Sequence, residues 1–229
     1  MKADLITDFL NGIIDDILVD VANAIKDGGF DPAILSPKEK MLFYPQASIY
    51  FEQGINMVQA QWSIWLKSRT IYGLSGIKRI GDTTYTGNLF NKAKDIILST
   101  SLPKISGTVR ASDLSENERY AAAVGVAPVS RSEETFSASA TIDHVDIEYE
   151  IEACVGCSMT LTKLDITVGK INVSTEGLGV LGEHLSEVST LASNAIKEWI
   201  VDTFKGVVAT KIQNVLDVKG PFTSPFVTE

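Results

Sequence analysis

Three glycines, Gly177, Gly179 and Gly182, have the spacing G-x-G-x-x-G of a dinucleotide-binding turn. In such a turn the backbone approaches a pyrophosphate, which lies at the N-terminus of the following helix. The fingerprint also requires a second parallel strand that ends in an acidic residue for the ribose. Here the helical pattern after the glycines is followed only by a short tail. We therefore expect a strand-to-helix turn, and a nucleotide-dependent enzyme remains the less favoured alternative.

The other residues with catalytic chemistry do not form a recognisable set. The two histidines are His144, in a strand-like run, and His184, near the start of a helical pattern. The sequence has neither a G-x-S-x-G elbow nor a G-x-x-x-x-G-K-[ST] loop. Adjacent carboxylates such as Glu133 and Glu134 are more typical of a solvated face than of an acid–base pair. We predict that the protein is not an enzyme.

The cysteines form one short motif, Cys154-Val-Gly-Cys157. A zinc site usually needs four ligands, so with two histidines in the chain we predict no metal site. The motif lies between two strand-like runs, which indicates a hairpin tip and not a thioredoxin-like redox helix. In a secreted protein the pair would form a local disulfide, and two free thiols are the alternative. Asn172-Val-Ser174 would then also be a glycosylation acceptor.

Charge and hydropathy exclude several classes of partner. The net charge is −9 and there is no basic cluster, so we expect neither nucleic-acid binding nor attachment to anionic lipid. No run of about 20 apolar residues is present, so we expect no stable membrane insertion. No signal peptide is visible, and secretion is expected on the assumption that a leader has been removed. Nothing in the sequence indicates an oligomeric state.

Two segments have apolar residues at every fourth position. Residues 3–27 carry two such rows opposite a face of aspartates, and end at Gly28 and Gly29. Residues 184–217 carry one row: Val188, Ala192, Ile196, Ile200, Phe204, Val208, Ile212 and Leu216. A helix advances about 100° per residue, so this row drifts by roughly 280° around the helix axis. It needs a surface that curls around the helix, or a break in the helix, for which Gly206 is the candidate.

Strand-like patterns occupy most of the chain between these helices. They are found within residues 47–110, at 134–153 and in a returning run at 158–174. In the second run the apolar parity changes near Asp143 and His144, which predicts a β-bulge.

Two intervening segments lack a strand pattern. Residues 30–45 contain three prolines and are expected to be a connection. Residues 112–134 are expected to be a loop with a short helix, because Ser115-Glu-Asn-Glu118 resembles a capping box.

The order of helix, strands and long helix shows no strand–helix alternation, so a parallel sheet is not expected. We predict an α+β fold, in which a long, highly curved antiparallel β-sheet wraps around a long C-terminal helix, with an N-terminal amphipathic helix. We expect one domain over residues 1–229, with a flexible tail at 219–229. A sheet that curls around a helix often leaves an apolar lumen.

Aromatic and aliphatic residues of the strands and the C-terminal helix are candidates to bind a ligand in this lumen, although any one of them could simply fill the core. The candidates are Trp62, Trp65, Tyr72, Phe136, Ile142, His144, Tyr149, Ile196, Trp199, Ile200, Phe204 and Val208.

Two segments resemble a known family. Residues 71–82, Ile-Tyr-Gly-Leu-Ser-Gly-Ile-Lys-Arg-Ile-Gly-Asp, resemble the G-L-x-x-hydrophobic-K-R-hydrophobic-G-D segment of the group 7 house-dust-mite allergens. Residues 158–162 resemble the strand after the hairpin in that family, and the flanking helices match in position. These allergens belong to the tubular lipid-binding superfamily, with takeout-like and juvenile-hormone-binding insect proteins and bactericidal/permeability-increasing protein. The cysteine pair and residues 112–134 depart from the mite pattern.

The resemblance implies a curved sheet rolled around the C-terminal helix and non-catalytic binding of an apolar molecule in a secreted protein. A fatty acid, an isoprenoid or a carotenoid-type pigment would fit a long tunnel. Our first hypothesis is therefore a carrier that transports or stores such a molecule between the sheet and the C-terminal helix, without a cofactor. The alternative is an innate-recognition module that binds microbial lipid on its outer surface.

Overall fold

The computed structural model describes residues 2–35, 38–44, 60–87, 103–126, 130–176 and 185–223. The elements are α1 (Lys2–Asp27), β1 (Ala33–Leu35), β2 (Lys38–Tyr44), β3 (Ala60–Tyr72), β4 (Ile77–Thr86), β5 (Lys104–Val126), β6 (Ser130–Glu152), β7 (Thr160–Val168), β8 (Ile171–Glu176), α3 (Leu185–Trp199), the π turn η2 (Ile200–Phe204) and α4 (Lys205–Lys219). All the strand pairs described are antiparallel. The predicted α+β order, with an antiparallel sheet between two terminal helical segments, is confirmed.

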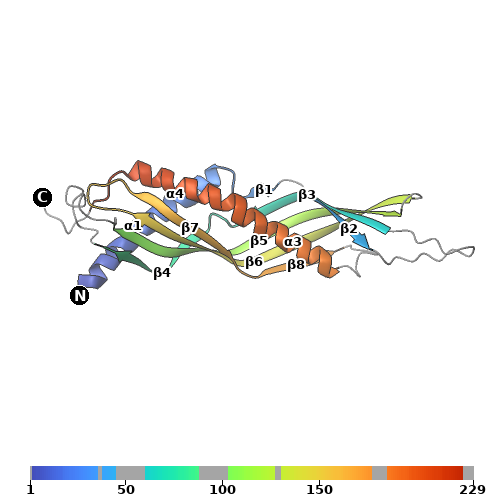
Figure 1. The fold of residues 1–229 in the computed structure, drawn as a ribbon, viewed down its shortest axis with the longest axis horizontal. Coiled ribbons are helices and arrows are strands. Elements are labelled where there is room, and N and C mark those ends of the chain that lie inside the picture. The colour runs from blue at the N-terminus through green and yellow to red at the C-terminus, as the bar shows by residue number, and fades with distance from the viewer. Residues whose placement is uncertain are drawn as a thin grey trace, which may run out of the picture.

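The strands β5 and β6 form the spine of the sheet. Each has 23 residues, and they pair along their full length. At about 3.4 Å per residue such a strand spans roughly 75 Å, which explains the elongated shape in Figure 1. On one side of the spine, β4 pairs with residues 104–111 of β5 and β3 pairs with residues 115–126. On the other side, β7 pairs with residues 145–152 of β6 and β8 pairs with residues 137–142.

The helices α1 and α4 lie over one half of this sheet, and α3 runs on along it (Figure 1). We call the half with α1 and α4 the proximal half; it contains β4, β7 and the parts of β5 and β6 that pair with them. There α1 packs on β4 and on α4, and α4 packs on β7. The distal half contains β2, β3 and residues 115–126 and 130–142 of the spine. Of the described helices, α3 comes nearest to the distal half, and it packs on β8 at the edge of the sheet.

The buried face of the sheet changes along a line between the two halves. In β5 the buried positions pass from Ala111 to Leu114, and in β6 from Val145 to Ile142, so the parity of the buried residues changes in both strands. The pairing register of β6 with β5, and with β7 and β8, is nevertheless unchanged across this line. In both strands the buried side of the sheet therefore switches at the same place, in keeping with the strongly twisted ribbon in Figure 1.

The β-bulge predicted at Asp143 and His144 is consequently wrong. No residue is inserted there: the N–H of Asp143 donates to the carbonyl oxygen of Lys170 at 3.0 Å, and the N–H of Gly169 donates to that of His144 at 2.9 Å. A change of parity in one strand looks the same in a sequence whether a residue is inserted or the whole sheet turns.

Residues 112–134 are strand wherever the structure describes them, so the prediction of a loop with a short helix is wrong. β5 continues to Val126 and β6 begins at Ser130. The local preference of a capping box is outweighed because Ser115 pairs with Tyr72 on one side and with Thr141 on the other.

The segment predicted as a connection at residues 30–45 contains β1 and β2, both of which pair with β3. Pro32 directly precedes β1, as expected because a proline cannot donate to a strand ladder, while Pro37 and Pro45 lie outside the described residues.

Asp31 holds the turn between β3 and β4. Its carboxylate accepts hydrogen bonds from the N–H of Gly73 at 2.9 Å, from the N–H of Ser75 at 2.8 Å and from the hydroxyl of Ser75. Burial would raise the pKa of this carboxyl group, but the bonds from Ser75 and Gly73 outweigh burial and place the pKa below its usual value of 3.8.

We expect Asp31→Asn to lower the free energy of unfolding by about 1–3 kcal/mol at neutral pH. Because the native pKa of Asp31 lies below the unfolded value of about 3.9, its contribution is present above that pH and is lost as the pH falls through the native pKa. Urea unfolding of both proteins at neutral pH and in acid measures this. A difference in stability that stays constant as the pH falls would show that the charge of Asp31 contributes nothing.

Candidate hydrophobic-ligand site

The apolar row of the C-terminal helix is buried along its described length. Seven members, from Ala192 to Leu216, are at most 4% exposed, and the side chain of Val188 lies outside the described residues. The regular α-helix is interrupted by the π turn at Ile200–Phe204, so a break is present. It does not lie at the predicted position Gly206, through which α4 continues. In the π turn the N–H of Lys205 donates to the carbonyl oxygen of Ile200, five residues back. The π turn contains one residue more than an α-helical turn, so the apolar positions after it are rotated back by about 100° around the helix axis. The total rotation of the apolar row around the axis therefore falls from roughly 280° to roughly 180°.

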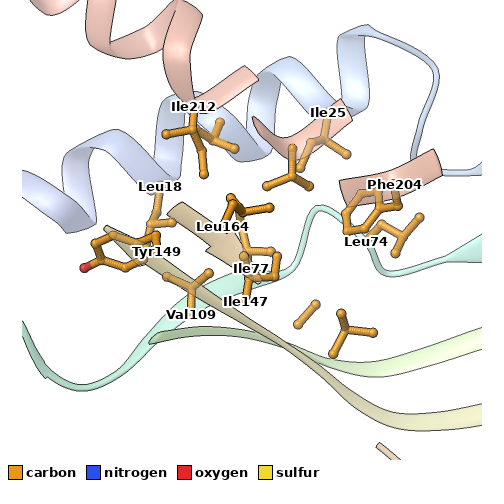
Figure 2. Packing of buried hydrophobic residues seen from close by; sticks show 14 of the residues in the cluster. Leu18, Ile25, Leu74, Ile77, Val109, Ile147, Tyr149, Leu164, Phe204 and Ile212 are labelled. Carbon is orange, nitrogen blue, oxygen red and sulfur yellow. The ribbon is translucent and has the colours of Figure 1, made fainter. Parts of the chain in front are cut away.

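The proximal half is filled by side chains. Figure 2 shows Leu18 and Ile25 of α1 facing Leu164 of β7 and Ile212 of α4 across one cluster. Near them lie Leu74, Ile77, Val109, Ile147, Tyr149 and Phe204. The two helices and the sheet thus close this half around a packed core.

Several of the residues predicted to bind a ligand belong to the buried cluster, which extends from this core to Ile142 at the near end of the distal half. Those in the buried cluster, none more than 5% exposed, are Ile142, Tyr149, Ile196, Ile200, Phe204 and Val208. Trp199 is partly buried against the cluster, and its ring stacks on Phe204 with centroids 6.1 Å apart. The structure brings these residues together, and in the proximal half their observed partners are other core residues.

Tyr149 packs over the backbone of the neighbouring strand. It pairs directly with Gly107, and a Cβ atom at that glycine would lie 2.5 Å from the Tyr149 hydroxyl oxygen. Burial raises the pKa of Tyr149, and the contact of its hydroxyl with Thr83 Oγ1 at 3.5 Å only partly opposes this rise. The phenol is therefore neutral at physiological pH and serves packing.

Tyr72 and His144 are not brought into the core. Tyr72 is 42% exposed. The ring of His144 covers Gly169, where a Cβ atom would lie 2.7 Å from the ring, and its Nε2 is 3.8 Å from a carboxylate oxygen of Asp146. Arg110 donates two hydrogen bonds to Asp146, at 2.6 and 2.7 Å, and thereby lowers the pKa of that carboxyl group. His144 thus belongs to a polar surface cluster.

The side chains of Trp62, Trp65 and Phe136 lie outside the described residues, but the backbone places their positions. Trp62 and Trp65 are three residues apart in one strand, so the pleat assigns them to opposite faces of the sheet. Trp62 pairs with Val124, and Phe136 pairs with Tyr120.

We call the sheet face that carries the buried residues Leu114, Ala140 and Ile142 the inner face. Strand alternation and register assign mainly apolar residues to it in the distal half: Leu42, Tyr44, Trp62, Ile64, Leu66, Tyr120, Ala122, Val124, Val126, Phe136 and Ala138. Its polar positions lie nearer the borders of this half, and they are Lys38, Lys40, Arg69, Glu116, Glu118, Ser130, Ser132 and Glu134. The outer face is more polar, with Gln61, Ser63, Asn117, Arg119, Arg131, Glu133, Thr135 and Ser137.

The sequence predicts Trp62 and Phe136 of the distal inner face but not the contribution of β5, because residues 112–134 are expected to be a loop. The run Tyr120–Val126 gives no signal of its face: Ala121, Ala123 and Gly125 lie between its other apolar residues, so apolar and polar residues do not alternate at a period of two.

The remaining predicted features are placed as follows. Asn172 is exposed on β8, while the glycine motif at 177–182 and His184 lie outside the described residues. Cys154 and Cys157 are joined by a disulfide. Within the described ranges no three metal-ligating side chains are grouped. Among the described helices, none combines the length and the apolar character needed to cross a bilayer.

Comparisons with known proteins found no matching family model and no matching curated protein. Among solved structures, Epiphyas postvittana Takeout 1 is similar with a TM-score of 0.37 and 14% identity, covering 92% of this chain and 93% of that one. A lipopolysaccharide binding protein is similar with a TM-score of 0.36 and 12% identity over 86% of this chain. The chain spans 38% of the length of that protein. Similarities at this level do not indicate a function. The function proposed below therefore rests on the sheet faces and side-chain contacts described above.

Proposed function

We propose that this protein is a non-catalytic carrier of a hydrophobic small molecule, which it holds on the distal inner face. The observation that carries the proposal is the extent of that face. It places apolar residues on four neighbouring strands, β2, β3, β5 and β6, beyond the half of the sheet on which the described helices α1 and α4 pack. An apolar face of this width must be covered to avoid water, and an apolar ligand covers it.

The packed proximal half restricts where the ligand lies. A tunnel along the whole C-terminal helix would have to displace fully buried side chains such as Ile200, Phe204 and Val208. Removing one large side chain from a packed core costs about 3–5 kcal/mol, so this core is not a place that a ligand enters. We therefore confine the ligand to the distal half, beside α3, and treat the proximal half as the scaffold.

Burial of apolar area supplies enough free energy for such binding. A ligand that removes about 300 Å² of apolar surface from water gains roughly 7 kcal/mol, which corresponds to a micromolar dissociation constant before the costs of ordering. The ligand class comprises fatty acids, isoprenoids and carotenoid-type pigments. The disulfide supports a secreted protein, because such bonds persist in oxidising compartments. We further propose that residues 1–229 form one domain, since the core joins α1, the sheet and α4.

The test is organic extraction of the purified protein followed by mass spectrometry, with a titration of delipidated protein by a fluorescent fatty acid. We expect either a stoichiometric apolar molecule in the extract or saturable uptake of one probe per chain. A visible absorption band would identify a pigment. Protein that is free of ligand and takes up no probe would contradict the proposal. Thermal stabilisation by a nucleotide instead would favour the enzyme alternative.

A further inference from the structure

The tip of the β6–β7 hairpin is a tight turn closed by the disulfide. The N–H of Cys157 donates to the carbonyl oxygen of Cys154 at 2.8 Å, and the Cα atoms of the two cysteines are 5.0 Å apart. Gly156 has φ of 80°, a conformation that glycine adopts without strain. The disulfide therefore fixes a four-residue turn whose outward backbone groups have a defined spacing.

The segment after α4 is bound to this turn. Phe222 accepts a hydrogen bond at its carbonyl oxygen from the N–H of Gly156 and donates its own N–H to the carbonyl oxygen of Cys157, both at 2.9 Å. Pro221 forms a β-bridge with Ser158. The first part of the segment expected to be a flexible tail is thus attached to the hairpin turn, while residues 224–229 lie outside the described residues.

The side chain of Phe222 seals the proximal end of the core. It is 2% exposed, and its ring meets Phe9 of α1 edge to face with centroids 6.3 Å apart. The C-terminal segment thus connects three parts of the chain: the hairpin turn, α1 and, through Gly220, the end of α4. Its position depends on the turn, because both backbone hydrogen bonds of Phe222 end within the disulfide loop.

We propose that the Cys154–Cys157 disulfide is a redox switch that holds the C-terminal segment 220–223 in the oxidised protein and releases it on reduction. Opening the bond leaves Gly156 and Cys157 in a turn that is free to sample other conformations. The N–H of Gly156 and the carbonyl oxygen of Cys157 are then no longer held at the spacing that binds the backbone of Phe222. Release of the segment uncovers Phe9 and the end of the proximal core. This switch does not depend on the identity of any ligand.

The reaction is thiol–disulfide exchange with a dithiol reductant. A thiolate of the reductant attacks the sulfur of Cys157, which is partly exposed, whereas Cys154 is fully buried. The S–S bond breaks, and Cys154 leaves as a thiolate that takes up a proton. The second thiol of the reductant then attacks the mixed disulfide and frees Cys157. The protein gains two electrons and two protons, and the reductant becomes a cyclic disulfide.

Amide hydrogen exchange of the full chain, before and after treatment with dithiothreitol, tests the switch. We expect the amides of Phe222 and Gly156 to exchange about tenfold faster or more after reduction, while that of Ile147 in β6 is unchanged. The double variant Cys154→Ser and Cys157→Ser should reproduce this pattern without reductant. Thr223→Ala, a change at an exposed neighbour of Phe222, should keep slow exchange until dithiothreitol is added.

Three results would overturn the proposal. The first is unchanged exchange of Phe222 in protein whose mass shows two free thiols. The second is an equal acceleration at Ile147, because the bond would then stabilise the whole fold and not one segment. Protein from an oxidising medium that already contains two free thiols would also contradict the switch.

Discussion

Deletion of Asp202 is expected to lower the free energy of unfolding by more than about 4 kcal/mol, or to prevent folding. Asp202 is an exposed residue within the π turn. Without it the turn closes as ordinary α-helix, and α4 rotates by about 100° relative to α3. Val208, Ile212 and Leu216, now at most 4% exposed, would then leave the core and α4 would lose its buried row.

The matched control is Asp202→Ala, which removes the side chain but keeps the backbone residue. We expect it to change the free energy of unfolding by less than about 0.5 kcal/mol, as for other surface substitutions. Urea unfolding followed by circular dichroism compares the two variants with the parent. A deletion variant as stable as Asp202→Ala would show that the rotation of α4 about its axis, and so its buried face, does not depend on the π turn.

Phe204→Ala is expected to cost about 3–5 kcal/mol of unfolding free energy. Phe204 has no exposed surface, stacks on Trp199 and faces Leu74 in the packed cluster of Figure 2. The cavity left by its ring is enclosed by α1, the sheet and the C-terminal helix, so its walls have little freedom to collapse.

Val218→Ala is the control on the same helical segment, because Val218 is 87% exposed, and its expected effect is less than about 0.5 kcal/mol. Chemical denaturation of both variants gives the comparison. A loss below about 1 kcal/mol for Phe204→Ala would mean that the proximal half is not a closely packed core. The proximal half could then admit a ligand, and the ligand would no longer be confined to the distal half.

The parts of the fold that could be predicted are those with a strong local period. The apolar rows of residues 3–27 and 184–217 identify the two helical segments, because a spacing of four suits a helix with a buried stripe. The drift of the second row indicated either an enclosing surface or a break, and Gly206 was the wrong position for the break. A π turn is set by hydrogen bonds to a residue five positions back, which leave no mark in the amino-acid types of Ile200–Phe204.

What could not be predicted depends on partners distant in the sequence. Glu116 to Glu118 favour a helix start locally, yet they form strand because β3 and β6 pair with them on both sides. Phe222 follows a glycine and a proline, a context typical of a loose tail, and is held by a turn about 65 residues earlier.

The candidate site was predictable only in part, for the same reason. Trp62 and Phe136 share the inner face, whereas Trp65 belongs to the other face and Tyr72 is exposed. Aromatic character suggested all four, but only the register between β3, β5 and β6 distinguishes them.

Binding of a fluorescent fatty acid by the variants Ala122→Lys and Ala123→Lys tests the central claim most directly. The two alanines are adjacent in β5, and each pairs with a glutamate of β6, Glu134 and Glu133 respectively. Only Ala122 lies on the inner face, where a charge in contact with an apolar ligand is costly.

With circular dichroism confirming that both variants fold, we expect Ala122→Lys to weaken binding at least about tenfold and Ala123→Lys to change it less than about twofold. Equal binding by the two variants, or a larger loss in Ala123→Lys, would contradict a ligand site on the distal inner face.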